Sequence, residues 1–257
     1  MKNNFILIII TIFCFLSCTN DNDGTLSSSA TTTLKFTHNW NTDVITSADF
    51  NTIQYTNENG QMLSIERLRY VISDITFRTN AGENLILDDY NLIDLTNDDG
   101  LSYSTNQIPI GNYVNVSFTF GFDNEDNAEN YLDLNSESFN VPDMLGGGYH
   151  YMQFDGKYLD TNSNEQGFNY HAIRAVDNPG MNPTFPQDTF FTVNLGPITV
   201  TNDIEIEIKA NLAEWFKSPN LWDLNVLNQT LMPNSSAQIM MSENGQTVFS
   251  LGDITNN

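Results

Sequence analysis

The chain has 257 residues, of which 32 are Asp or Glu and 9 are Lys or Arg, so its formal net charge is −23. This charge excludes a surface that tracks nucleic-acid phosphates, and it favours cations as partners. The two cysteines, Cys14 and Cys18, both lie near the N-terminus. The rest of the chain therefore has no disulfide and no cysteine-ligated metal site.

The N-terminus predicts an export signal. Lys2 provides a short positive region, and residues 5–16 form a mostly apolar run that is too short to span a bilayer comfortably. The segment Phe15-Leu16-Ser17-Cys18 resembles the lipobox of bacterial lipoproteins, in which the cysteine is acylated. We therefore expect residues 1–17 to be a signal peptide. Cys18 would then anchor the protein in the outer membrane, on its periplasmic or cell-surface face.

Residues 18–33 are expected to form a flexible, acidic tether. Beyond the cysteine they are almost entirely Asn, Asp, Gly, Ser, Thr and Ala, so they bury too little to offset the entropy of ordering. Asp21 and Asp23 resemble the surface-export signals of lipoproteins from the Bacteroidota. Residues 34–257 are then expected to form one domain, which is long enough to bury a core without disulfides.

Alternating apolar and polar residues predict β-strands in this domain, because successive side chains of a strand point to opposite faces. Ile204-Glu205-Ile206-Glu207-Ile208 is a clear example. Turns separate the strands at short intervals, a pattern typical of a sandwich. The expected fold is all-β, a single antiparallel β-sandwich. Its predicted strands include residues 34–40, 65–78, 83–95, 114–120, 149–155, 168–175, 189–195 and 204–208.

A few short helices are expected, mainly near the C-terminus. Asn211 can cap a turn over residues 212–216, and a second helix covers residues 235–243. Residues 127–133 also have the potential to turn helically. The side chains expected in the core of the sandwich are Phe36, Leu68, Tyr70, Ile72, Ile75, Leu92, Phe118, Phe120, Phe154, Ile206 and Ile208.

The chemistry-bearing motifs do not indicate an enzyme. The sequence contains no Gly-x-Ser-x-Gly nucleophile elbow and no His near a Ser and an Asp in a recognisable context. The loop Asp123-Asn124-Glu125-Asp126-Asn127 has oxygen ligands at alternate positions, as calcium loops do, but it lacks the remaining EF-hand pattern. Calcium is therefore a weaker expectation than an exposed acidic loop.

Three histidines, His38, His150 and His171, each lie beside aromatic residues in a predicted strand. A period of two places Met152 on the same face as His150. Imidazole nitrogen suits copper or zinc, and thioether sulfur suits cuprous copper. These four side chains are the candidate metal ligands, with Met144 as another sulfur donor. The competing interpretation is that the histidines only support the strands.

Several short segments occur in an ordered set that covers most of the domain. This set resembles the MbnP-like family of secreted, copper-associated β proteins. The segments are Phe36-Thr37-His38, residues 64–75, Leu92-Ile93-Asp94-Leu95, residues 108–113, residues 118–123, residues 148–156, Phe168-Asn169-Tyr170-His171 and residues 241–249.

The resemblance implies a β fold and copper binding. Characterised members of the family bind copper through histidines and a tryptophan that a partner di-haem enzyme has oxidised to kynurenine. His171 stands in the family's Phe-x-x-His segment, His38 in its Phe-x-His segment, and His150 after its Gly-Tyr pair. One or two tryptophans usually precede that Gly-Tyr pair, whereas residues 142–147 of this chain contain none. The family's kynurenine chemistry is therefore not expected to carry over unchanged.

We expect a non-enzymatic copper-binding or copper-handling lipoprotein of the cell envelope that does not bind nucleic acid. The alternative is a cell-surface interaction module, for glycan or protein, built on the same sandwich without a metal. The geometry of the histidines separates the two, because ligands of one ion bring their nitrogens to within about 4 Å of each other.

Overall fold

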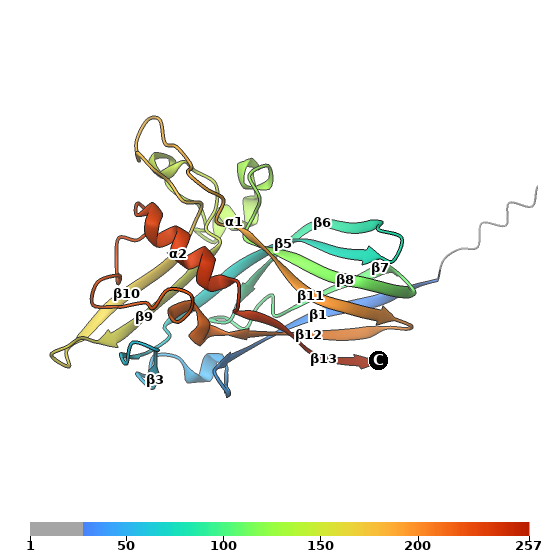
Figure 1. Cartoon of the computed structure of the whole chain (residues 1–257), viewed down its shortest axis with the longest axis horizontal. Coiled ribbons are helices and arrows are strands. Elements are labelled where there is room, and N and C mark those ends of the chain that lie inside the picture. The colour runs from blue at the N-terminus through green and yellow to red at the C-terminus, as the bar shows by residue number, and fades with distance from the viewer. Residues whose placement is uncertain (1–27, 257) are drawn as a thin grey trace, which may run out of the picture.

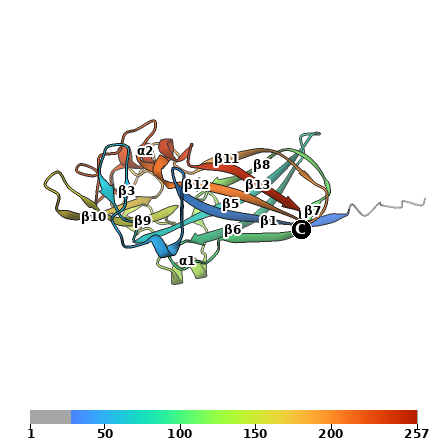
Figure 2. The same ribbon diagram turned by 90° about the horizontal axis from the view of Figure 1, so that it is seen from below.

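The computed structural model describes residues 28–256 and consists of two β-sheets packed as a sandwich (Figures 1 and 2). The smaller sheet has the order β13-β12-β1-β2, and β7 also pairs with β1. Its strands are β1 (Ser29–Trp40), β2 (Asp43–Ile45), β7 (Ser102–Pro109), β12 (Ile204–Asn211) and β13 (Phe249–Asn256).

The larger sheet has the order β11-β8-β5-β9-β4-β3. In addition, β6 pairs with β5, and β10 pairs with β9. Its strands are β3 (Tyr55–Thr56), β4 (Met62–Leu63), β5 (Arg67–Thr79), β6 (Asn84–Asp94), β8 (Gly111–Phe120), β9 (Met152–Leu159), β10 (Glu165–Ala172) and β11 (Phe191–Val200).

The helical segments are short. Those over residues 212–216 and 235–245 lie where the sequence predicts them, although the Asn211 side chain does not cap the first as expected, and the helices at residues 47–49 and 143–145 were not predicted. The side chain of Asn234 caps the longest of them, accepting a hydrogen bond from the amide of Ala237 at 3.1 Å. The remaining connections between the strands contain single turns. The helices are η1 (Ser47–Asp49), η2 (Asp126–Ala128), α1 (Leu132–Ser136), η3 (Asp143–Leu145), η4 (Leu212–Phe216) and α2 (Ser235–Gly245).

An aromatic layer fills the space between the sheets. Phe120 lies within it, with its ring centroid 4.9 Å from that of Phe191, 5.2 Å from Trp215 and 5.7 Å from Phe249. Burial of such large apolar surfaces is the main favourable contribution to folding. The core residues predicted from the sequence are buried, except that Leu92 is only partly buried at the edge of the layer.

The first strand begins earlier than the sequence indicated. Residues 29–33 were expected to belong to the tether, but β1 starts at Ser29, and Ala30 and Thr32 are buried. Thr32 pairs with Ile204 of β12 on one side and with Thr105 of β7 on the other. Two neighbouring strands therefore satisfy the backbone groups of a segment whose side chains are too small to signal burial.

The direction of one pairing also differs from the expected antiparallel arrangement. Strands β1 and β12 run parallel, with Phe36 opposite Ile208, whereas the other pairings of the described strands are antiparallel. Alternation of apolar and polar residues determines which face of a strand is buried, but it carries no information on strand direction. The smaller sheet is therefore a mixed sheet, because it contains one parallel pair of strands.

The predicted signal peptide and Cys18 lie outside the described residues. Within residues 28–256, no helix has the length and apolar character needed to cross a membrane.

Replacing Phe120 by Ala should lower the free energy of unfolding by about 3 to 5 kcal/mol, because the cavity would open at the centre of the aromatic layer. Val114 provides a matched control on the same strand, since its side chain is 45% exposed. Val114→Ala should cost less than about 1 kcal/mol. Urea unfolding of the two variants measures the difference, and equal losses would contradict the described packing.

Candidate metal centre

The predicted metal ligands lie on both faces of the larger sheet. Met152 belongs to the hydrophobic core on the inner face of β9, and His38 reaches the same core from β1. His171 lies on the outer face of β10, between the buried residues Tyr170 and Ala172. The expectation of one site with all four ligands is therefore wrong, because the sheet separates His38 and Met152 from His171.

His38 is a structural residue of the core. Its Nε2 atom lies 3.1 Å from the hydroxyl oxygen of Tyr70, and the two rings meet edge to face. Only 3% of its surface is exposed, and this burial lowers the pKa of His38 to about 4. The imidazole is therefore neutral at neutral pH, and its bond to Tyr70 links the two sheets.

His171 is held by a carboxylate. Strands β9 and β10 pair so that Asn169 lies opposite Asp155, and the His171 Nε2 atom is 2.8 Å from Asp155 Oδ1. Burial alone would raise the pKa of Asp155, but hydrogen bonds from His171 and Asn169 and the charge of Arg67 lower it to about 2. The ionised carboxylate can only accept, so His171 donates from Nε2 and keeps Nδ1 for another partner.

His150 immediately precedes β9 and is fixed by a backbone carbonyl. Its Nδ1 atom donates to the oxygen of Phe139 at 2.9 Å, and its backbone amide donates to the same oxygen. Burial lowers the pKa of His150 to about 4 against the effect of this hydrogen bond, and the charges of His171, Arg67 and Arg69 act in the same direction as burial. A neutral ring that donates from Nδ1 carries its lone pair on Nε2.

The two rings come together on the outer face of the sheet. The centroids of His150 and His171 are 5.2 Å apart, and the rings are nearly perpendicular. Among the described residues, the buried His150 Nε2 atom has no hydrogen-bond partner. Metal-binding histidines usually donate their second nitrogen to a carboxylate or a carbonyl, as these two do to Asp155 and Phe139. The pair therefore presents two imidazole rings, whose nitrogens are the donors that copper and zinc accept.

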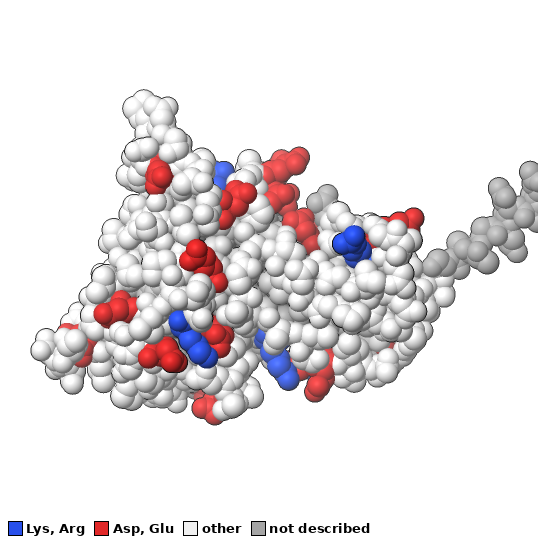
Figure 3. Space-filling model, viewed as in Figure 1, with Lys and Arg blue, Asp and Glu red and all other residues white. Residues whose placement is uncertain are grey.

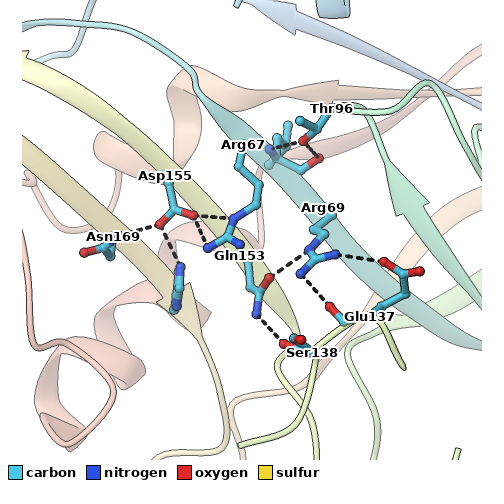
Figure 4. A network of polar contacts seen from close by, with 10 residues as sticks. Arg67, Arg69, Thr96, Glu137, Ser138, Gln153, Asp155 and Asn169 are labelled. Atoms are coloured by element: carbon cyan, nitrogen blue, oxygen red, sulfur yellow. Dashed lines mark hydrogen bonds and ion pairs between the residues drawn. The ribbon is translucent and has the colours of Figure 1, made fainter. Parts of the chain in front are cut away.

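A buried arginine holds the segment that orients His150 (Figure 4). Arg69 donates from Nε to Gln153 Oε1 at 2.8 Å and from Nη2 to the backbone oxygen of Glu137 at 2.8 Å. Gln153 in turn donates to the backbone oxygen of Ser138 at 3.3 Å. These contacts fix residues 137 and 138 against β5 and β9, so the carbonyl of the next residue, Phe139, is held in place.

The acidic loop that was a weaker candidate for calcium uses its first carboxylate to hold its own backbone. Asp123 Oδ1 accepts hydrogen bonds from the amides of Glu125 at 2.8 Å and Asp126 at 2.9 Å. In the part of the chain that the structure describes, no three His, Cys, Asp or Glu side chains group as metal ligands. A metal held by the histidine pair would therefore have only two ligands of these types among the described residues.

Sequence reasoning missed two residues that support this pair, Asp155 and Arg69. Asp155 lies within residues 148–156, a segment that supported only the family resemblance. In the pairing of β9 with β10, it is diagonal to His171, a relationship that a prediction of strand register would have shown. Nothing in the sequence indicated that Arg69 is buried, because isolated charged residues in predicted strands usually face solvent.

Comparison with known proteins agrees with the ordered segments. The sequence profile of a family described as MbnP matches residues 29–241. The fold is similar to that of MbnP from Methylosinus trichosporium, with a TM-score of 0.53 and 11% sequence identity. The similarity covers 87% of this chain and 98% of that protein. No curated protein matches the sequence. At this identity the structural likeness informs the fold alone.

The buried His38 predicts a pH dependence of stability. Its pKa falls from 6.5 in an exposed state to about 4 in the fold, so the unfolded chain binds the proton more readily. Stability should therefore decrease as pH falls below 6.5 and continue to decrease down to about 4, with a loss of about 2 kcal/mol between about pH 7.5 and about pH 5 from this residue. His38→Gln should show a shallower dependence in urea unfolding. The same slope in both proteins would refute the assignment.

Proposed function

This chain belongs to the MbnP family, and from that premise we propose that it is a non-enzymatic copper-binding protein of the cell envelope. One observation carries the proposal, namely the buried His150 Nε2 lone pair beside the ring of His171. A buried polar atom without a partner costs free energy, and a bound ion would remove that cost. His150 would hold copper through Nε2, and His171 through Nδ1.

Cuprous copper suits this pair better than a divalent ion. Arg67 and Arg69 act on the site, since their charges add to the effect of burial in lowering the pKa of His150. Arg67 is ion-paired with Asp155 and Arg69 with Glu137. The Asp155 carboxylate therefore does not leave a net negative charge that would favour a divalent cation over a monovalent one. Monovalent copper also tolerates few protein ligands, and imidazole is among those it accepts.

The tryptophans support a site without a modified side chain. Trp40, Trp215 and Trp222 are each at most 4% exposed and pack in the aromatic layer between the sheets. This layer lies on the inner face of the larger sheet, opposite the face that carries His171. We therefore propose no kynurenine ligand in this chain and assign no step to a di-haem partner enzyme.

The surface and the N-terminus are consistent with a cation-binding protein outside the cytoplasm. Acidic side chains are spread over the face shown in Figure 3, with few basic groups among them. A net charge of −23 raises the local concentration of cations. We propose that Cys18, within its lipobox-like segment, anchors this domain in the outer membrane.

The histidine pair can be tested directly by Cu(I) titration in competition with a chromogenic chelator. His150→Ala and His171→Ala should each weaken copper binding by at least about 100-fold, because each removes one of two nitrogen donors. His38→Gln serves as the control and should bind as the wild type does. If all four proteins bind copper with the same stoichiometry and affinity, the metal proposal fails. A metal-free surface interaction module would then be the better description.

The carboxylate behind His171 gives a second test. Asp155→Asn should weaken copper binding by about 10- to 100-fold, because the amide no longer favours an Nε2–H tautomer that leaves Nδ1 for the ion. Glu165→Gln removes the same charge from an exposed residue on the neighbouring strand and should have little effect. Equal affinities for the two variants in the same titration would show that Asp155 has no role in the site.

A further inference from the structure

A cavity lies next to the segment that carries His150, since Tyr149 is among its lining residues. Its volume is about 370 Å³, within the usual range for sites that bind small molecules. Asparagines from the loop after β8, glycines of the loop before β9, and Arg174 from the segment after β10 line it. Its lining residues are Asn127, Ala128, Glu129, Asn130, Asn140, Gly146, Gly148, Tyr149 and Arg174.

Arg174 is the cation of this cavity, and in the described part of the chain it forms no ion pair within 4.0 Å. Its guanidinium lies over the ring of Phe185, 3.3 Å from the centroid. Nη1 is 3.4 Å from Asn124 Oδ1, and Nε is buried without a hydrogen-bond partner. Burial lowers the pKa of Arg174 and the charge of Asp188 raises it, but Asp188 accepts a hydrogen bond from Asn124 and makes no ion pair with the guanidinium within 4.0 Å. The guanidinium has donors left for a ligand.

The glycine wall of the cavity is closely packed. Gly146 and Gly148 have φ angles of 96° and 76°, in the region that favours glycine. A Cβ on Gly146 would lie 2.4 Å from the Phe185 ring, and a Cβ on Gly148 would lie 2.7 Å from Asn127. The buried Asn127 accepts a hydrogen bond from the amide of Tyr149 at 2.9 Å. These contacts fix the glycine wall, which at Gly146 lies against Phe185 and Arg174, so the cavity is a preformed one.

The remaining lining groups suit hydroxyl groups. Asn130 Oδ1 accepts from Asn135 at 2.8 Å, and Asn140 Nδ2 donates to Asn135 at 2.6 Å. Asn130 therefore keeps its Nδ2 donor and Asn140 its Oδ1 acceptor. Glu129 adds a further acceptor at the cavity, and its charge disfavours a simple multivalent anion such as phosphate. A wall of amides with one cation and one carboxylate matches a hydroxyl-rich ligand with a single negative charge.

We propose that this cavity binds an acidic saccharide unit, of the uronic acid class. Its carboxylate would pair with the guanidinium of Arg174, and its hydroxyl groups would bond to Asn130, Asn140 and Glu129. This inference goes beyond copper binding and uses none of the proposed metal ligands. Its success or failure is therefore independent of the copper titration.

Isothermal titration calorimetry tests the proposal by measuring the affinity of the protein for glucuronate, galacturonate and mannuronate. Glucose, galactose and mannose serve as their neutral counterparts. At least one acid should bind about 10- to 100-fold more tightly than its neutral counterpart, the range expected for a charge-assisted bidentate contact. Arg174→Gln should remove this preference, and Arg174→Lys should retain only part of it. Arg78→Gln removes the same charge from an exposed strand residue and should change nothing.

The arginine variants could lose binding through a folding defect, so Asn130→Asp provides a second test of the cavity. Asn130 is exposed, and its replacement should not disturb the fold. The substitution replaces a donor by a negative charge, so it should weaken the acid and leave Cu(I) affinity unchanged. The proposal is overturned if none of the three acids binds, if acid and neutral sugar bind equally, or if Arg174→Gln and Asn130→Asp both bind the acid as the wild type does.

Discussion

The register between β9 and β10 is the constraint on which both the core and the histidine pair depend. Phe154 pairs with Tyr170 on the inner face, where both join the aromatic layer. The same register places Asp155 diagonal to His171 on the outer face, close enough for a hydrogen bond. A slip of one residue would exchange the two faces and bury the charged groups. The packing of aromatic rings therefore determines the geometry of the polar site behind them.

Periodicity predicted the strands and most of the core because it reports directly on burial. It placed Phe120 and Ile206 in the core, and the helices over residues 212–216 and 235–245 were recognisable from the residues that end them. Two features depended on partners far away in the chain and were missed. The burial of Thr32 and the parallel direction of β1 both arise from its pairing with β12, which no local pattern encodes. Pairing partners are a property of the whole fold.

The candidate site was predictable only in part, for a related reason. The sequence singled out three histidines, and two of them come together. Alternation along a strand shows which residues share a face, but it does not show which face is buried. His38 therefore could not be assigned to the inner face until its partner Tyr70 was known. The large number of carboxylates hid Asp155, because no composition argument distinguishes one of 32. The proximity of Asp155 to His171 follows from the pairing of their strands and cannot be read from their spacing along the chain.

The parallel pairing of β1 with β12 also has a kinetic consequence. Strand β1 is the first described element and β12 is the last but one strand, so the centre of the smaller sheet joins opposite ends of the domain. Closing a loop of this length is entropically costly, and contacts of high sequence separation slow folding. During synthesis, one edge of β1 therefore stays unpaired until β12, near the end of the chain, has been made. The smaller sheet can therefore form completely only when both ends of the domain are present.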